Sequence, residues 1–268
     1  MEGGIKIMSI TTRQKHIQEY LSEHETLSVA DATELFQASA ATIRRDFAEI
    51  ALHGGVTRIR GGICRNLNQQ DKLIPLILRE KWYSDEKRYL ACRVCQYLEN
   101  VRTIFIDGGS TTTHLGIFLK DPRQVIITNS LPLCNIIAEL YPSGGGPEVR
   151  MTGGRFHPES GLFLGANAEA AAAAYHAEVT VLSARGITPS GIYNHNELIA
   201  GINRSMIGHS DRVILIADQS KIGISAMNRV CPLDRIEALF TVETAENKAV
   251  LAEIRAAGVK VFSDSPFC

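Results

Sequence analysis

The sequence contains no apolar run long enough to cross a membrane, because no stretch approaches the roughly 18 uninterrupted apolar residues that a transmembrane helix needs. Residues 1–7 include no apolar segment of the kind that signal peptides carry. The six cysteines are dispersed along 268 residues, and a chain of this length buries a core without disulfides. We therefore expect neither a membrane span nor a disulfide framework, and a location in the reducing cytoplasm.

Patterns for binding metals or common cofactors are also missing. Cys92 and Cys95 have the spacing of zinc ligands, but no second Cys or His pair lies nearby, so we interpret them as buried helix thiols. The eight histidines show no ligand spacing, although His195 falls near the rim of the ligand pocket predicted below. The sequence has neither a Walker A motif nor a Gly-x-Gly-x-x-Gly fingerprint, and we expect no metal and no cofactor.

A large excess of charge of either sign is absent as well, because the net charge is −1. Binding to nucleic acid through a uniformly basic surface is therefore not expected. Between Thr42 and Arg65, however, five arginines stand against two acidic residues, a local excess of +3. Any electrostatic contact with nucleic acid is expected in this segment.

The composition is that of an ordinary globular protein, with 45% hydrophobic and 21% charged residues. A length of 268 residues suggests about two domains. Residues 65–74 are polar and are interpreted as a linker. We therefore predict a first domain over 9–64 and a second over 75–268.

Residues 39–51 have the pattern of an amphipathic helix. Ser39 is a natural N-cap, and Ile43, Phe47 and Ile50 recur at helical spacing, which predicts one buried stripe. The opposite side carries small residues beside arginines, which suits a helix that enters the major groove of DNA. The candidate DNA-contacting residues of this helix are Ser39, Ala41, Thr42, Arg44 and Arg45. Taken alone, the pattern fits a solvated amphipathic helix equally well.

The segment before this helix favours DNA binding. A helix is predicted over 12–23, in which we expect Arg13 and Lys15 to be solvated. Residues 28–36 predict a second, short helix with Ser28 as its cap, and a tight turn follows it. Two short helices joined in this way form a helix-turn-helix.

The segment after the helix predicts a wing. Residues 56–60 alternate in polarity between two pairs of glycines, which is typical of a small β-hairpin with a turn at Gly61 and Gly62. The alternation places Arg58 and Arg60 on one face, where both suit contact with phosphate or the minor groove. Arg58 and Arg60 complete the set of candidate DNA-contacting residues.

After residue 100, short apolar strands alternate with helical patterns, which predicts a mostly parallel, Rossmann-like α/β sheet with helices on both faces. The predicted strands are 103–106, 125–128, 148–151, 179–182, 213–217, 238–242 and 260–262. The predicted helices are one starting at Pro75, then 85–99, 112–119, 131–140, 167–176, 197–208 and 246–257. The whole chain is thus expected to be a multidomain α/β protein.

Polar or glycine-containing loops follow the predicted strands, at the edge of a parallel sheet where ligands bind. The loop after the first strand combines two glycines with hydroxyl groups and precedes a helix, which favours a phosphate site, although a plain strand-to-helix turn remains an alternative. Its residues are Asp107, Gly108, Gly109, Ser110, Thr111 and Thr112. The later loops contribute Thr128, Asn129, Gly153, Gly154, Arg185 and Lys221. Together they predict a pocket for a small anionic ligand.

These segments carry a family resemblance. Val29 to Gly62, with Thr42-Ile43-Arg44-Arg45-Asp46 and Arg58-x-Arg60-Gly61-Gly62, resembles the DNA-binding domain of DeoR-type transcriptional regulators. The loops from Asp107 to Thr112 and from Asp218 to Gly223, with Glu197 opening its helix, resemble the effector domain of the same family. This sequence departs from the family where Arg60 replaces the usual His, where Phe47 replaces Leu, and at Arg185.

The resemblance implies a fold similar to ribose-phosphate isomerase in the second domain and a sugar-phosphate effector, which adds Glu197 to the effector-binding candidates. We expect a sequence-specific repressor of a carbohydrate-utilisation operon that binds double-stranded operator DNA as a homodimer or homotetramer, is relieved by a phosphorylated sugar or polyol, and is not an enzyme. The alternative is a sugar-phosphate isomerase with an appended DNA-binding domain. Asp107, Asp218 and Glu197 are then candidates for the carboxylate that moves a proton.

Overall fold

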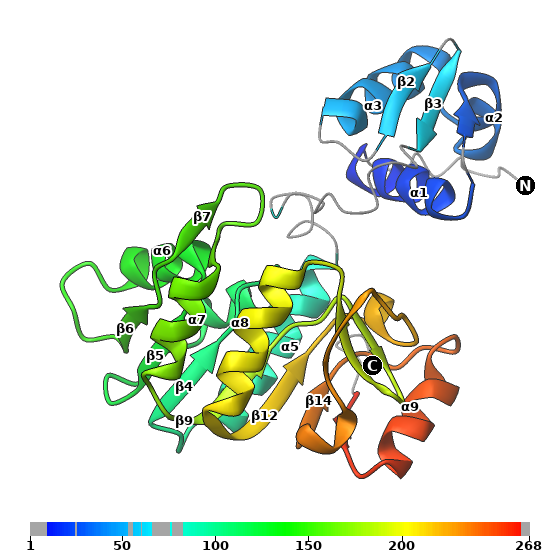
Figure 1. The fold of residues 1–268 in the computed structure, drawn as a ribbon. Helices are drawn as coiled ribbons and strands as arrows, with labels where there is room; N and C mark the ends of the chain where they lie inside the picture. The colour runs from blue at the N-terminus through cyan, green and yellow to red at the C-terminus, as the bar shows by residue number, and fades with distance from the viewer. Residues whose placement is uncertain are drawn as a thin grey trace, which may run out of the picture. The chain divides into compact units, whose positions relative to one another are not determined.

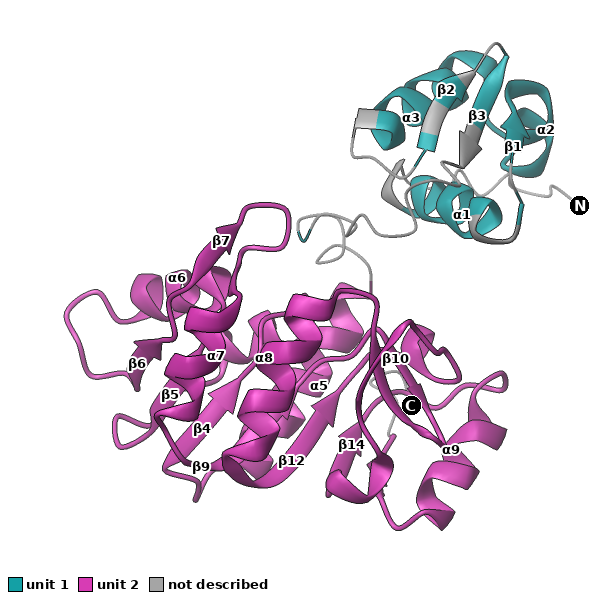
Figure 2. Ribbon diagram, viewed as in Figure 1, with its two compact units in different colours: residues 1–78 teal, residues 79–268 magenta. Residues whose placement is uncertain are grey.

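The protein divides into two compact units, residues 1–78 and 79–268 (Figure 2). In this computed structural model, the described residues are 10–24, 26–52, 56–59, 61–65, 76 and 83–263. The predicted linker beyond Arg65, the start of the helix at Pro75 and the wing residue Arg60 lie outside them. Among the described residues, none of the helices is both long and apolar enough to span a membrane.

The N-terminal unit is a winged helix-turn-helix (Figure 1). Its elements are α1 (Ile10–Glu23), β1 (Thr26–Ser28), α2 (Val29–Leu35), α3 (Ala40–Leu52), β2 (Val56–Ile59) and β3 (Gly62–Arg65). The three strands form an antiparallel sheet in the order β1-β3-β2. One apolar core joins the helices to this sheet, and its buried side chains include Ile17, Leu21, Leu27, Ile43, Phe47 and Ile63.

The hairpin differs from the prediction at Gly62, which lies in β3 and not in the turn. An added Cβ at Gly62 would stand 2.5 Å from the backbone oxygen of Leu27, so the approach of the unpredicted strand β1 requires glycine there. The turn itself contains Gly61, whose φ of +82° is in the left-handed region.

The C-terminal unit is built on a seven-stranded parallel sheet in the order β15-β14-β12-β9-β4-β5-β6. The strands are β4 (Thr103–Ile106), β5 (Val125–Thr128), β6 (Glu148–Met151), β9 (Ala177–Leu182), β12 (Ser210–Ile216), β14 (Ala238–Phe240) and β15 (Lys260–Phe262). All seven predicted strands are present, with shifted ends in β9, β12 and β14. The predicted fold class is confirmed.

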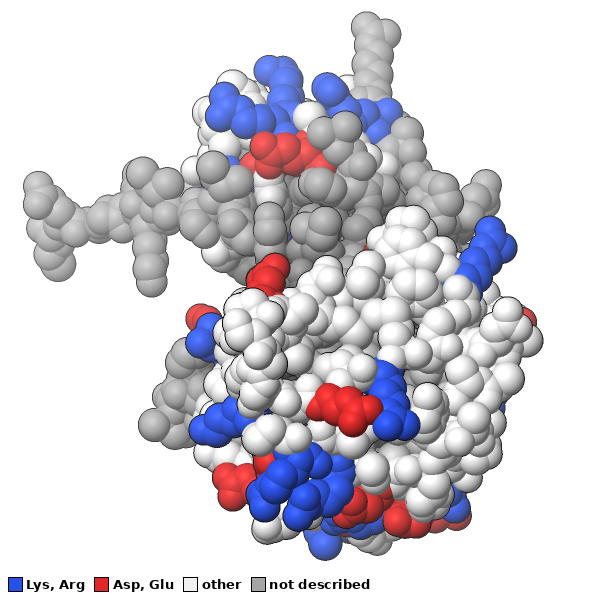
Figure 3. All heavy atoms as spheres, turned by 90° about the vertical axis from the view of Figure 1, so that its left-hand side faces the viewer, with Lys and Arg blue, Asp and Glu red and all other residues white. Residues whose placement is uncertain are grey.

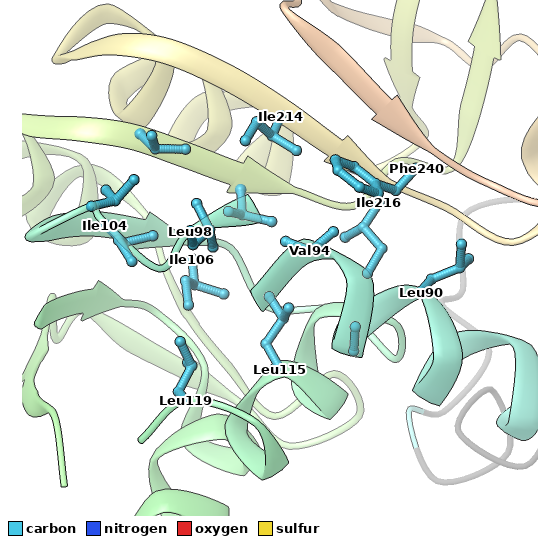
Figure 4. Close-up of a cluster of buried hydrophobic side chains, with 14 of the residues drawn as sticks. Leu90, Val94, Leu98, Ile104, Ile106, Leu115, Leu119, Ile214, Ile216 and Phe240 are labelled. Carbon is cyan, nitrogen blue, oxygen red and sulfur yellow. The ribbon is translucent and has the colours of Figure 1, made fainter. Parts of the chain in front are cut away.

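Helices cover both faces of this sheet (Figure 1). The helical elements are α5 (Ser84–Tyr97), η2 (Thr112–Ile117), α6 (Leu131–Leu140), α7 (Ala166–Ala173), α8 (Glu197–Gly208), η3 (Gln219–Lys221), η4 (Leu233–Arg235) and α9 (Lys248–Ala256). The main core lies under α5, where Leu90, Val94 and Leu98 pack on the isoleucines of β4 and β12 (Figure 4). On the opposite face, the Thr180 hydroxyl of β9 donates to the backbone oxygen of Met206 in α8.

Two features of this unit were not predicted. A hairpin of β7 (Arg155–His157) and β8 (Leu162–Leu164) follows β6, and β10 (Gly186–Thr188), β11 (Gly191–Asn194) and β13 (Asn228–Cys231) form a small antiparallel sheet. The helix predicted over 112–119 is present in a shorter form, because this segment is the six-residue 3₁₀ helix η2 and not an α-helix. The hairpin, the small sheet and η2 all lie next in the chain to predicted ligand loops.

Candidate DNA-binding surface and effector site

The helix-turn-helix is held by local capping. The Ser28 hydroxyl accepts a hydrogen bond from the backbone N–H of Asp31 at the start of α2 (3.0 Å). Before α3, the Ser39 hydroxyl accepts from the N–H of Thr42 (3.2 Å), which satisfies one of the helix's unpaired donors. The predicted stripe of Ile43, Phe47 and Ile50 is buried. α3 is therefore amphipathic, and its apolar side faces the core of the unit.

The opposite side of α3 is open to solvent. Ala41, Arg44 and Arg45 are exposed, and Thr42 is half-buried. Arg58 is exposed on β2. Figure 3 shows lysine and arginine side chains clustered on part of the surface of the N-terminal unit. Exposed arginines on α3 and β2 give this unit donors for phosphate and for base edges.

An ion pair that the sequence did not reveal links α1 to α3. Arg13, expected to be solvated, is buried, and its Nε lies 2.5 Å from Oδ2 of Asp46. Asp46 is also buried, so its charge is neutralised inside the unit and does not lie on the exposed side of α3 that carries Arg44 and Arg45. Gln14 of α1 adds hydrogen bonds to Asp46 and Glu49 of α3. α3 is thus tied to α1 by polar contacts as well as by the core.

The candidate effector loops meet at a topological switch point of the parallel sheet. From β4 the chain proceeds through β5 and β6 on one side, and from β9 through β12, β14 and β15 on the other. The strand order therefore reverses between β4 and β9, which is where ligands bind in open α/β sheets. The loops after β4, β5, β9 and β12 surround this point.

The loop after β4 packs closely against its neighbours at two glycines. The N–H of Gly108 donates to Oδ1 of Asn129 in the loop after β5 (3.0 Å). A Cβ at Gly108 would stand 2.0 Å from Leu162, and one at Gly109 would stand 2.2 Å from the Ser183 hydroxyl. Three segments that are distant in sequence are thereby packed against one loop.

The hydroxyl groups of the same loop are buried but are used differently. Thr112 and Thr113 both donate to the backbone oxygen of Gly109. Thr111 precedes η2 and is buried, yet its side chain makes no capping hydrogen bond. Within the described residues, the N–H groups of Gly109, Ser110 and Thr111 donate to no other group. The loop therefore presents a set of donors suited to an oxyanion.

Lys87 of α5 is the main residue that the prediction missed. Its ammonium group donates to the Ser110 hydroxyl (3.2 Å) and lies 3.9 Å from Oδ2 of Asp218, and the side chains of Lys87 and Asp218 are each 2% exposed. A signal was available, because Lys87 falls on the same helical stripe as Leu90 and Val94. A charge on a buried stripe indicates a buried partner.

Asp218, which follows β12, also contacts Ser220 and Lys221 in the loop after that strand. Its Oδ1 accepts hydrogen bonds from the N–H and the hydroxyl of Ser220. Lys221 lies 4.0 Å from the same oxygen and donates to the Ser220 hydroxyl (2.9 Å). The structure thus brings two lysines, one from α5 and one from η3, to a single carboxylate.

Positive charge near the loop also affects His114 in η2. Burial lowers the pKa of His114 below its ordinary value, and the charges of Lys87 and Arg88 lower it further. Nε2 of His114 is buried and has no hydrogen-bond partner among the described residues. The surroundings of η2 therefore disfavour an additional cation.

Four predicted effector residues stand apart from this cluster. Gly153 and Gly154 adopt positive φ after β6, and Gly154 packs on Ala168 of α7. Arg185 is exposed, and its N–H donates to the oxygen of Tyr193. Glu197 is exposed in the first turn of α8, and in the described part of the chain no hydrogen bond joins it to the loops.

Two surface hollows lie away from the cluster. One lies between α6 and residues 144–151, and the other between α5 and residues 118–124. Neither is lined by a candidate effector residue. We therefore define the candidate site by its convergent polar groups at the switch point.

A winged helix-turn-helix with exposed arginines, on one chain with an α/β unit, is the architecture of a DNA-binding transcriptional regulator. Residues 13–69 match the model of the DeoR-like helix-turn-helix domain, and residues 83–243 match that of the DeoR C terminal sensor domain. The chain belongs to the DeoR family of transcriptional regulators.

Curated relatives extend over nearly the whole chain. It is 26% identical over 238 residues to the HTH-type transcriptional regulator IolR of Bacillus subtilis (strain 168), which covers 88% of this chain and 92% of that protein. It is 26% identical over 262 residues to a putative aga operon transcriptional repressor of Escherichia coli O157:H7, covering 97% and 96%.

Solved structures resemble the chain more distantly. Ribose 5-phosphate isomerase A from Methanocaldococcus jannaschii has 12% sequence identity and a TM-score of 0.36, with 52% of this chain and 54% of that chain covered. A resemblance at that score has no bearing on activity.

Proposed function

We propose that the chain is a repressor of a carbohydrate-utilisation operon and that a phosphorylated sugar or polyol relieves its binding to operator DNA. The observation that carries this proposal is the convergence of Lys87, Lys221 and the donor-rich loop 109–111 at the switch point of the sheet. Such a cluster suits a small anion, and it shares a chain with a helix that presents arginines. The relative named a putative aga operon transcriptional repressor supports repression as the direction of regulation.

Regulation requires that the effector bind two arrangements of the protein with different affinity. One helix-turn-helix covers one half-site, and a dimer places two recognition helices about 34 Å apart along one face of DNA. We propose that the protein acts as a homodimer or homotetramer in the cytoplasm. An extended area without charge on the C-terminal unit, on the side of β6 and β7, supports self-association (Figure 3). Leu140 at the end of α6, Met151 of β6 and Phe156 of β7 are exposed apolar side chains of these elements.

We further propose that the site binds its ligand without turnover. An isomerase needs a carboxylate poised beside the substrate. Of the three candidate carboxylates, Asp218 already accepts two hydrogen bonds from Ser220 at Oδ1, and Glu197 is exposed and not joined to the loops by hydrogen bonds. The third, Asp107, is buried in the loop after β4, so an assay of turnover has to decide its role. Turnover of pentose or hexose phosphates above about 1 s⁻¹ by the purified protein contradicts this part of the proposal.

The experiment that tests the proposal combines two measurements on the full chain. Operator DNA is selected from fragments of the source genome, and its release is followed while phosphorylated pentoses, hexoses and polyols are added. Their unphosphorylated counterparts serve as controls. A thermal-shift screen against the same panel detects binding directly, because a ligand at 100 times its Kd stabilises the folded protein by about 2.7 kcal/mol. If no phosphorylated compound stabilises the protein or releases the DNA, the proposed effector class is wrong.

A further inference from the structure

The buried ammonium group of Lys87 contacts the donor-rich loop 109–111. Its Nζ donates to the Ser110 hydroxyl at 3.2 Å, and Ser110 stands between Gly109 and Thr111, whose N–H groups have no acceptor within the described residues. A lysine that is 2% exposed has lost its hydration, so contact with an anion is strongly favoured there.

An anionic ligand can replace Asp218 as the charged partner of Lys87. At 3.9 Å, Nζ and Oδ2 attract each other as charges but are too far apart for a hydrogen bond. Asp218 keeps other partners, because Ser220 donates to its Oδ1 and Lys221 lies 4.0 Å from the same oxygen. An incoming oxyanion can therefore form a shorter, charge-assisted hydrogen bond to Lys87 while Asp218 remains satisfied.

A second buried group near the loop still has donor capacity. Asn129 is fully buried, and its Oδ1 accepts from the N–H of Gly108. Its Nδ2 has no hydrogen-bond partner among the described residues. A buried amide without an acceptor is costly, and an oxyanion beside the loop can supply that acceptor.

Lys87 lies near the start of α5, so a ligand bound to it can affect the segment that precedes this helix. Lys87 is in the first turn of α5, and its N–H donates to the oxygen of Tyr83, the N-cap residue. Tyr83 has φ of 53° and ψ of 38°, a left-handed conformation that residues with a Cβ rarely adopt. The segment before Tyr83 is the one that leads from the DNA-binding unit. A shift at Lys87 thus acts one helical turn from Tyr83, the first residue of the C-terminal unit that the structure describes.

We propose that Lys87 binds the anionic group of the effector together with the loop 109–111, and that α5 transmits this contact to the segment before Tyr83. The inference rests on the proposed function and deepens it, because it assigns to a helix outside the strand-end loops both a ligand contact and the step that reports ligand binding.

The test uses the full chain, inorganic phosphate as the probe and chloride to keep the ionic strength constant. Phosphate affinity is measured by calorimetric titration, and emission is recorded from Trp82, the single tryptophan of the sequence, which directly precedes Tyr83. We expect the wild type to bind phosphate and to change its Trp82 emission. In Lys87→Met, phosphate affinity should fall at least about tenfold, since one charge-assisted hydrogen bond and one buried charge are lost, and the emission change should disappear.

Lys120→Met is the matched control, because it removes the same charge from an exposed lysine and should bind phosphate as the wild type does. If Lys87→Met does not fold, Asp218→Asn is compared with Lys87→Met/Asp218→Asn, in which no buried charge is left without its partner. The double variant should again bind phosphate at least about tenfold more weakly than Asp218→Asn alone.

The outcomes are distinguishable. Wild-type affinity in Lys87→Met, or equal affinities in the Asp218→Asn pair, overturns the assignment of Lys87 and leaves the proposed function standing. Weakened binding with an unchanged Trp82 response overturns the transmission through α5. Failure of the wild type to bind either phosphate or any sugar phosphate overturns the proposed function, and this inference with it.

Discussion

The guanidinium of Arg13 and the carboxylate of Asp46 form a buried, two-point ion pair between α1 and α3. Nε lies 2.5 Å from Oδ2 and Nη2 lies 3.3 Å from Oδ1, and the two side chains are 5% and 2% exposed. Asp46 directly follows Arg45, so the pair fixes α3 on α1 next to an exposed arginine. The orientation of α3 therefore depends on a contact that is buried inside the unit, away from its exposed arginines.

Arg13→Met should lower the free energy of unfolding of the N-terminal unit by about 3–5 kcal/mol, because it leaves the Asp46 charge buried without its partner. Urea unfolding followed by circular dichroism measures the change. Arg13→Met/Asp46→Leu should recover most of it, since no unpaired charge remains. Lys15→Met is the control, because Lys15 is half-buried and its pair with Glu19 at 3.8 Å is partly exposed. Equal losses in the single and double variants would contradict the buried-charge explanation.

Arg45→Ala should weaken binding to the selected operator by about 1–3 kcal/mol, if its guanidinium makes a bidentate base contact. Arg58→Ala on β2 should instead weaken binding to all sequences and reduce the salt dependence by about one unit, as expected for one lost phosphate contact. Gel-shift titrations over a range of salt concentrations separate the two effects. Unchanged operator affinity in both folded variants would refute the assignment of α3 as the recognition helix.

Much of the fold followed from sequence patterns that depend on near neighbours. Most of the parallel strands were predicted because they are short, mainly apolar runs, as in β4, β5 and β12, and α3 was predicted because its cap and its stripe of Ile43, Phe47 and Ile50 agree. The strands β7, β8 and β10 were missed because they are short antiparallel strands outside the strand-helix alternation, which identified the equally short strands β14 and β15 of the parallel sheet.

The remaining errors have physical causes of their own. The helix predicted over 112–119 became η2 because the hydroxyls of Thr112 and Thr113 both bond to the oxygen of Gly109 and compete with α-helical bonding. The role of Lys87 depends on Asp218, which is far away in the sequence and comes close only in the folded sheet. Local periodicity places Lys87 on the buried stripe of its helix, but it does not indicate which residue is its partner.

His114 should make the stability of the protein depend on pH. Burial, aided by Lys87 and Arg88, lowers its pKa in the folded state from the ordinary 6.5. Below about pH 6.5 the unfolded chain binds a proton that the folded chain does not, so stability is lost as the pH falls from about 7.5 to about 5.5. His114→Gln should show a smaller loss than the wild type in urea unfolding at the two pH values. An identical pH dependence in the two proteins would argue against this effect.

Three cysteine thiols should resist alkylation in the native protein. Burial raises the pKa of Cys95 to about 12, with a further contribution from Cys92, and burial raises the pKa of Cys134 and of Cys231 to about 11. At about pH 8 almost none of these thiols is ionised, and the thiolate is the reactive form. Mass spectrometry after iodoacetamide treatment should find them unmodified in the native protein and modified in urea. Rapid native labelling of Cys95 would contradict its burial.

The last prediction concerns the response to effector. Thr111 is buried without a capping hydrogen bond, and Lys221 donates to the Ser220 hydroxyl beside Asp218, so we expect both to contact a phosphate group at the loop. Thr111→Val and Lys221→Met should fold and should bind operator DNA in the absence of effector as the wild type does. Release of that DNA by the sugar phosphate found in the panel should need at least about ten times more ligand, because a charge-assisted contact is lost.

Thr113→Val is the matched control for the first variant, because its hydroxyl already donates to Gly109 at 2.8 Å and should matter for stability but not for the response. Lys248→Met, an exposed lysine on α9, controls for the charge change in the second. DNA release is measured by gel shift at increasing effector concentrations, and in cells the variants should remain repressors that the inducer does not relieve. If both variants respond at the wild-type concentration, the phosphate is bound elsewhere. The exposed side chain of Arg185, after β9, is then the next candidate, because it is the remaining predicted cation at this edge of the sheet.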